Sequence, residues 1–171
     1  MTREGSEPLR IALVHHSPVP PAAGELAGAL RAAGHHAEVV TGRGVPLLER
    51  VLRFRGFAVP LTQVPATVAK LRRGGFDVAH AFTRQDALAA RLWRRISGRP
   101  VVFGCAEPLG RDQLADRRLA LRLLERAVED SDAVVAHSEE ARAALWRWLA
   151  IDVPLLDPRD AAAHERLYRG L

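Results

Sequence analysis

The sequence is short of cysteine, lysine and aromatic residues, and each shortage excludes a class of protein. The single cysteine, Cys105, permits no intramolecular disulfide, which is typical of a reducing compartment. Aromatic residues make up 5% of the chain, too few for a base-stacking surface, and no block of five basic residues occurs. Lys70 is the only lysine, so the net charge of +5 rests on scattered arginines. Nucleic-acid binding is therefore not expected.

Long apolar runs are also missing. No stretch approaches the roughly 20 apolar residues that span a bilayer, and the first eight residues lack the apolar core of a signal peptide. We expect a cytoplasmic protein that touches a membrane at most peripherally, at its inner face. Residues 1–8 are expected to form a disordered tail. Residues 9–171 are expected to form one domain, because 171 residues can bury a sufficient core without a disulfide or metal.

Short apolar runs alternate with helical patterns along the chain. Six runs predict strands, at residues 10–16, 37–41, 77–82, 100–105, 133–137 and 153–156. Helical spacing predicts helices at 25–33, 65–73, 86–96, 111–129, 139–150 and 161–169, while three prolines predict a loop at 17–24. The fold class is therefore α/β: a single Rossmann-like, doubly wound parallel sheet of about six strands with helices on both faces.

Polar residues follow several of the predicted strands. In an open parallel sheet, ligands bind at the carboxyl ends of the strands. The candidate binding residues at that edge are His15, His16, Ser17, His80, Glu107, His137 and Ser138. Helix N-termini begin at the same edge and favour an anion, so a phosphate or a polyhydroxylated ligand would suit it.

Each candidate has a structural alternative. Adjacent residues on a strand point to opposite sides, so one of His15 and His16 is expected to be structural. For His80 the alternative is a hydrogen bond to the backbone, and for His137 with Ser138 it is a strand end followed by a helix N-cap. Cys105 is either a nucleophile or, as we expect, a small core residue.

The sequence lacks the standard cofactor and metal motifs. It has no phosphate-binding P-loop, and Gly42-Arg43-Gly44 lacks the third glycine of a dinucleotide fingerprint. No HExxH, paired CxxC or Asp-rich loop occurs, so no metal site is expected. His35 and His36, at the turn between the first helix and the second strand, are expected to face solvent at the opposite edge of the sheet.

Five segments, in order, resemble the N-terminal, acceptor-side domain of family 4 retaining glycosyltransferases, which have the two-domain GT-B fold. The segments are residues 11–26, 27–41, 76–82, 99–108 and 131–142. The resemblance implies that Gly24 approaches the phosphates of a nucleotide-sugar donor, which is a substrate, and that transfer needs no metal or other cofactor. The tail at 161–171 resembles the terminal helix that crosses back onto this domain.

Two departures from the family define the hypotheses. The family usually has a histidine after the fourth strand, where this chain has Ala106 followed by Glu107, the one candidate for a catalytic contact. The E-x₇-E pair of the donor-binding domain does not occur in the chain. We expect an acceptor-side domain that works with a separate donor-binding partner on a sugar or lipid-linked acceptor. The alternatives are a non-catalytic sugar-binding, nucleotide-binding or regulatory module, and an unrelated small Rossmann-like enzyme.

One further segment suggests a membrane contact. Residues 47–57 place three arginines beside apolar side chains, the composition of an interfacial helix; the apolar residues are Leu47, Leu48, Val51, Leu52 and Phe54. An ordinary helix that packs on the sheet and exposes its arginines is the alternative.

Overall fold

A computed structural model describes residues 7–16, 21–42, 63–106 and 118–171. Five parallel strands form one sheet in the order β2-β1-β3-β4-β5. Their bounds are β1 Arg10–Val14, β2 His36–Val40, β3 Val78–Ala81, β4 Val101–Cys105 and β5 Ala133–Ala136. The α/β class and the Rossmann-like parallel sheet are therefore confirmed.

The predicted sixth strand is not formed. In residues 153–156, Leu155 makes only an isolated parallel bridge to Ala136. The backbone N–H of Ala136 donates to Pro154 O, and the N–H of Leu156 donates to Ala136 O, both at 2.9 Å. The ladder goes no further because Pro154 has no N–H to donate and Pro158 follows two residues after Leu156.

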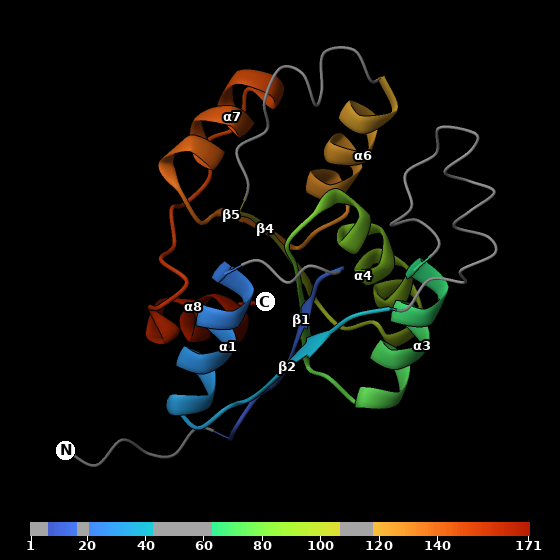
Figure 1. Cartoon of the computed structure of the whole chain (residues 1–171), viewed down its shortest axis with the longest axis vertical. Helices are drawn as coiled ribbons and strands as arrows, with labels where there is room; N and C mark the ends of the chain where they lie inside the picture. Colours follow the sequence, from blue (N-terminus) through green and yellow to red (C-terminus); the bar gives the residue numbers. More distant parts are fainter. Residues whose placement is uncertain (1–6, 17–20, 43–62, 107–117) are drawn as a thin grey trace.

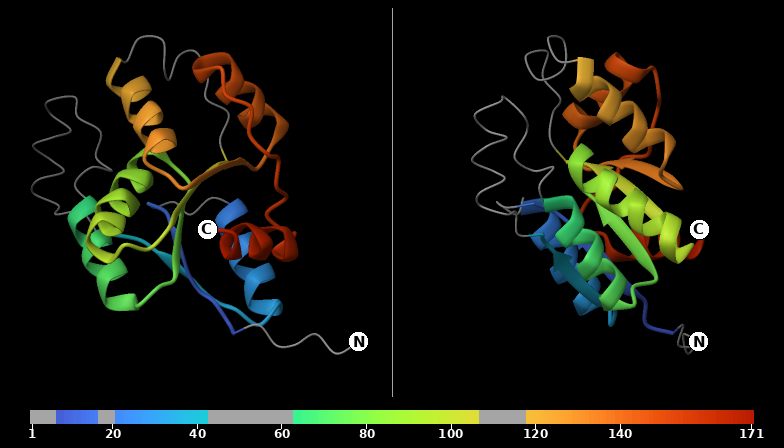
Figure 2. Two further views of the ribbon diagram at one scale, coloured as in Figure 1. Left: turned by 180° about the vertical axis from the view of Figure 1, so that it is seen from behind. Right: turned by 90° about the vertical axis from the view of Figure 1, so that its right-hand side faces the viewer.

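Helices cover both faces of the sheet, as predicted. Their bounds are α1 Pro21–Ala32, α3 Val64–Gly74, α4 Arg84–Ser97, α6 Arg118–Glu129, α7 Glu139–Leu149 and α8 Ala161–Arg169. In Figure 1, α1 and α8 lie side by side on one face, while α3, α4 and α6 pack next to one another on the other face. The two views in Figure 2 show the same layers, with α7 beyond β5. None of the described helices is long and apolar enough to span a bilayer.

The first helix begins earlier than the sequence predicted. Residues 17–24 were expected to be a loop, but α1 starts at Pro21. Proline is compatible with the first turn of a helix, where its missing N–H would have no intrahelical partner. Gly24 consequently lies within α1, exposed to solvent, and not in the predicted loop.

Side-chain caps fix the starts of two predicted helices. Ser138 Oγ accepts from the N–H of Ala141 at 3.1 Å and caps α7, and Asp160 accepts from the N–H of Ala163 at 2.9 Å and caps α8. Ser and Asp at this position satisfy N–H groups that the helix leaves unpaired. Both starts agree with the predicted boundaries.

The core has two layers because successive side chains of each strand point to opposite faces. Ala12 and Val14 of β1 pack in the layer under α3, α4 and α6, whereas Ile11 and Leu13 pack under α1 and α8. Cys105, 3% exposed, belongs to the first layer and is a core residue, as expected.

The prediction for His35 is wrong. Its side chain is buried, with Nδ1 accepting from the N–H of Leu9 at 3.3 Å and Nε2 lying 3.5 Å from Glu165 of α8. Gly34, at a φ of 93°, reverses the chain after α1 and carries His35 inward. The neighbouring His36 is exposed, as expected.

The outer edge of β2 is covered by two cations. Arg31 Nε donates to Ala37 O at 2.7 Å, and Lys70 Nζ of α3 donates to Thr41 O, just past the end of the strand. Because β2 is an edge strand of the described sheet, these carbonyls have no strand beside them to provide a donor.

Two glycines of contrasting environment test the packing. A Cβ on Gly104 of β4 would lie 2.0 Å from His80 Nε2 and 2.5 Å from His137 Nε2. A Cβ on Gly28 of α1 would meet no atom of the described residues within 4 Å beyond its own helix backbone and chain neighbours. We expect Gly104→Ala to lower the free energy of unfolding by about 1–3 kcal/mol. Gly28→Ala should raise it by about 0.5–1 kcal/mol.

Urea denaturation of the two variants beside the unchanged protein makes the comparison. Equal stability of Gly104→Ala and the unchanged protein would contradict the close packing of the two imidazoles on β4.

Candidate functional site

The strand order places a switch point between β1 and β3. From β1 the chain passes outward to β2, and from β3 it passes the other way to β4 and β5. Ligands of open α/β sheets bind in the crevice at the carboxyl ends of the strands that flank such a point. There β1 leads into His15 and His16, and β3 leads into Phe82 and Thr83.

Four side chains meet at this edge: His15, His16, Thr83 and Asp86. We call them the switch-point cluster. Thr83 is the N-cap of α4: its Oγ1 accepts from the N–H of Asp86 at 3.3 Å and donates to Asp86 Oδ2 at 2.6 Å. Asp86 is 5% exposed, so this reciprocal cap holds a buried carboxylate at a fixed place in the first turn of α4.

The two histidines lie together. Their rings stack with centroids 4.7 Å apart and planes inclined by 12°, which corrects the expectation that they point to opposite sides. Strand alternation does not apply because β1 ends at Val14, one residue before the pair. His15 is buried and also meets the ring of Phe82 edge-on, with centroids 6.4 Å apart.

His16 is the accessible member, with 24% of its side chain exposed. Its Nδ1 lies 3.4 Å from Asp86 Oδ1 and 3.4 Å from Thr83 Oγ1. A carboxylate can only accept, so the pair is favoured when Nδ1 carries the proton. The carboxylate thereby orients the ring, as acidic partners of functional histidines do.

The cluster can therefore orient a hydroxyl group or accept a proton. Among the described residues, His15, His16 and Asp86 each offer one possible ligand atom within 4.8 Å of the others. The two imidazole planes are inclined by only 12°, so a single ion cannot lie in both ring planes.

A second set of polar side chains links α8, β3 and the residue that follows β5. The Tyr168 hydroxyl of α8 is 2.7 Å from His80 Nδ1, His80 Nε2 is 3.2 Å from His137 Nε2, and His137 Nδ1 is 3.0 Å from Leu156 O. A carbonyl only accepts, so His137 Nδ1 carries a proton and its Nε2 accepts from His80. His80 Nδ1 must then accept from Tyr168. The bonds thus run in one direction through neutral rings.

Burial favours the uncharged form of every group in this chain of bonds. Desolvation holds the pKa of His80 well below its usual value, reinforced by His137 and His164. Desolvation also lowers the pKa of His137, although its bond to Leu156 and the charge of Asp157 oppose the shift. Burial lowers the pKa of His164 to about 4 and raises that of Tyr168.

The remaining sequence candidates are spread around the fold. His80 is fully buried in β3, and both of its ring nitrogens are bonded to other side chains. Ser138 uses its hydroxyl as the cap of α7. Ser17, Glu107 and the segment 47–57 lie outside the described residues. Ligand binding by the candidates stays a prediction.

Sequence reasoning missed Thr83, Asp86 and Tyr168. A signal existed for the first two, because Thr83-Arg84-Gln85-Asp86 follows a predicted strand with the spacing of a capping box. For Tyr168 the signal was weaker: the terminal helix has His164 and Tyr168 four residues apart, on one face, as its buried residues.

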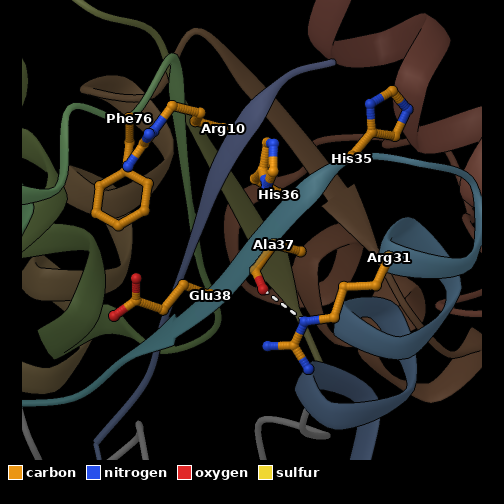
Figure 3. A pocket seen from close by; sticks show the side chains of 7 residues that line it. All are labelled: Arg10, Arg31, His35, His36, Ala37, Glu38 and Phe76. Atoms are coloured by element: carbon orange, nitrogen blue, oxygen red, sulfur yellow. Dashed lines mark hydrogen bonds between the residues drawn. The ribbon is translucent and has the colours of Figure 1, made fainter.

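A separate hollow of about 400 Å³ lies at the opposite edge of the sheet (Figure 3). Its lining includes Arg10, Arg31, His36, Glu38 and Phe76. The two arginines already donate to backbone carbonyls, Arg10 to Gly74 O at 2.8 Å and Arg31 to Ala37 O at 2.7 Å. This edge holds the amino ends of the strands, so the topology favours the switch-point cluster as the candidate site.

Solved structures of glycosyltransferases share the fold. A chain of sucrose-phosphate synthase from Thermosynechococcus elongatus has a TM-score of 0.63 at 18% identity, over 94% of this chain and 98% of that chain. Another structure of that synthase has a TM-score of 0.64 at 17% identity, over 87% of this chain and 48% of that chain. HepE from Anabaena, in complex with UDP, has a TM-score of 0.57 at 18% identity, over 81% of this chain and 40% of that chain. The chain thus spans less than half of the latter two.

These likenesses show the fold, a Rossmann-like domain. The particular family follows from the sequence itself. The sequence model of Glycosyltransferase Family 4 matches residues 22–154. The chain therefore belongs to Glycosyltransferase Family 4, and the resemblance to an N-terminal domain of that family is confirmed. Among curated protein sequences, none matches the chain.

The neutral histidines make stability depend on pH. The unfolded chain takes up protons at an ordinary histidine pKa of about 6.5, whereas His164 in the folded protein does so only at about 4. Between these values the unfolded state binds more protons, so stability falls as the pH falls. We expect a loss on the order of 3 kcal/mol from His164 between about pH 6.5 and pH 4, with His80 and His137 adding to it.

Urea denaturation at stepped pH measures this dependence. His164→Leu should flatten the profile below pH 6.5, while His36→Asn, at an exposed position, should leave it unchanged. A wild-type profile that is flat from about pH 6.5 to 4.5 would contradict the neutral buried rings.

Proposed function

We propose that this chain forms the acceptor side of a sugar transfer in which a nucleotide sugar is the donor. A second, donor-binding domain on a partner chain completes the cleft. The acceptor is a sugar or a lipid-linked molecule. The family match over residues 22–154 carries the proposal.

The physical demands of transfer support a two-domain arrangement. The donor diphosphate must be held and water excluded while the glycosidic bond exchanges, and enzymes achieve this by closing around the substrates. A single open sheet edge leaves its ligands in contact with water. A domain with this fold therefore needs a second wall facing the carboxyl ends of β1 and β3.

The switch-point cluster supplies polar contacts for the acceptor. His16 is accessible and oriented by Asp86, so it is placed to accept a hydrogen bond or a proton from an acceptor hydroxyl. Gly24 remains the residue proposed to approach the donor phosphates. Apart from its own chain neighbours and helix backbone, no atom of the described residues lies within 4 Å of the place of a Cβ on Gly24.

A tagged chain, recovered at native expression level from its own cells, tests the partnership. We expect a stoichiometric partner that carries a donor-binding domain with an E-x₇-E pair. The complex should transfer sugar from a nucleotide sugar, and the isolated chain should not. Transfer by the isolated chain would contradict the need for a partner.

The same complex tests the role of His16. His16→Asn should keep the partner but slow transfer about tenfold, the loss of one hydrogen bond. His36→Asn, at the opposite edge, serves as the matched control and should transfer at the normal rate. If His16→Asn transfers sugar at the unchanged rate, the switch-point cluster is not part of the acceptor site.

A second candidate function, a non-catalytic binding or regulatory module, is favoured by one observation. Ala106, directly after β4, is half-buried against the core layer under α1 and α8 and offers only a methyl group where the resembled family usually has histidine. The proposed transferase would then lack one polar contact near the reacting sugar.

Ala106→His discriminates between the two candidates. If the chain contributes to catalysis, the restored imidazole should change the transfer rate of the partnered protein. No change in rate, in a complex whose assembly and stability are intact, would favour the binding module.

A further inference from the structure

We propose that the hollow shown in Figure 3 binds a small hydroxy-dicarboxylate, a molecule with two carboxylates and a hydroxyl group between them. The hollow lies at the edge of the sheet that holds the amino ends of the strands, and its volume of about 400 Å³ is in the size range of small-molecule sites. Arg10, Arg31 and Glu38 are the ligand contacts that we assign to it. The proposal does not depend on the proposed sugar transfer, because the switch-point cluster lies at the other edge.

Both arginines are held in place and still have N–H groups to donate. Arg31 Nε donates to Ala37 O at 2.7 Å, and Figure 3 shows the two terminal nitrogens of Arg31 beyond this bond. Arg10 Nη2 donates to Gly74 O at 2.8 Å. Within the described ranges, no residue accepts from the terminal nitrogens of Arg31 or from Nε and Nη1 of Arg10. A guanidinium fixed in this way presents a fork of donors that matches a carboxylate.

The two positive charges have no counter-charge of their own in the described part of the chain. Arg99, at the same edge, pairs with Asp77 at 3.6 Å, whereas no described carboxylate pairs with Arg10 or Arg31. Both line the same hollow, and Figure 3 shows them on opposite sides of β2. A ligand that compensates both charges therefore needs two acidic groups, one for each guanidinium.

Glu38 accounts for the hydroxyl group of the ligand. It lies on β2, which runs between the two arginines, and its partner on β1 is Ala12, two residues after Arg10. The side chains of Arg10 and Glu38 therefore project from the same face of the sheet. A carboxylate can only accept hydrogen bonds, so the part of the ligand that meets Glu38 must donate one. A hydroxyl group between the two acidic groups is such a donor.

The charge of the site favours carboxylates over phosphates as the acidic groups. Arg10 and Arg31 carry two positive charges and Glu38 carries one negative charge, which leaves one positive charge. The helices α1 and α3 also end at this edge, at Ala32 and Gly74, and the C-terminal end of a helix carries a partial negative charge. Two phosphates would bring about four negative charges to this site, whereas two carboxylates bring two.

Calorimetric titration of the whole chain with malate at low salt tests the proposal. We expect one malate per chain, bound at least about tenfold more tightly than succinate, which lacks the hydroxyl group. Arg10→Gln and Arg31→Gln should each weaken malate binding at least about tenfold, through the loss of a charge-assisted hydrogen bond. Glu38→Ala should remove the preference for malate over succinate. Arg126→Gln, at an exposed position of α6, changes the net charge equally and should bind malate as the unchanged protein does.

Circular dichroism establishes that the variants are folded. If one is not, the side-chain Nε resonances of the unchanged protein decide the question: malate should shift those of Arg10 and Arg31 and leave that of Arg126 in place. Absence of malate binding, equal affinities for malate and succinate, tighter binding of inorganic phosphate, or an equal loss in Arg126→Gln would each overturn the proposal. Failure of sugar transfer would leave it standing, since the readout is malate binding.

Discussion

The packing at the centre of this structure depends on one buried imidazole that must stay neutral. His80 lies in the middle strand of the sheet with no solvent contact, so each ring nitrogen needs a protein partner. One nitrogen requires a donor and the other an acceptor. Tyr168 of α8 and His137, which follows β5, meet these needs.

The need to bond both ring nitrogens of His80 also constrains neighbouring strands and helices. Position 104 of β4 has room only for glycine, since the edges of two imidazoles occupy the place of a side chain. The terminal helix α8 is tied to β3 through Tyr168, and Arg159, just before α8, pairs with Glu25 of α1 at 2.8 Å. The last helix is therefore an integral part of the layer over β1 and β3, although it comes last in the chain.

The layers could be predicted from the sequence, whereas the site could not. Alternating apolar runs and capping residues such as Ser138 and Asp160 are local signals, and they gave the helices and the parallel sheet. The stacking of His15 on His16 depends on where β1 ends. The strand ends at Val14, two residues before the predicted end, and a sequence pattern does not fix a strand end that closely. His35 is buried by a glycine turn and by α8. These contacts join distant segments, which single-sequence patterns do not encode.

The two cations at the edge of β2 hinder a strand of another molecule from pairing with the sheet. A free edge offers carbonyl groups that an extended segment of another molecule can pair with. Arg31 and Lys70 occupy the carbonyls of Ala37 and Thr41, and they bring positive charge to the same margin. A strand approaching from outside would have to displace both side chains and strip water from both charges. This flank therefore acts as a boundary that keeps the sheet from recruiting foreign strands, and it employs the chain's single lysine to do so.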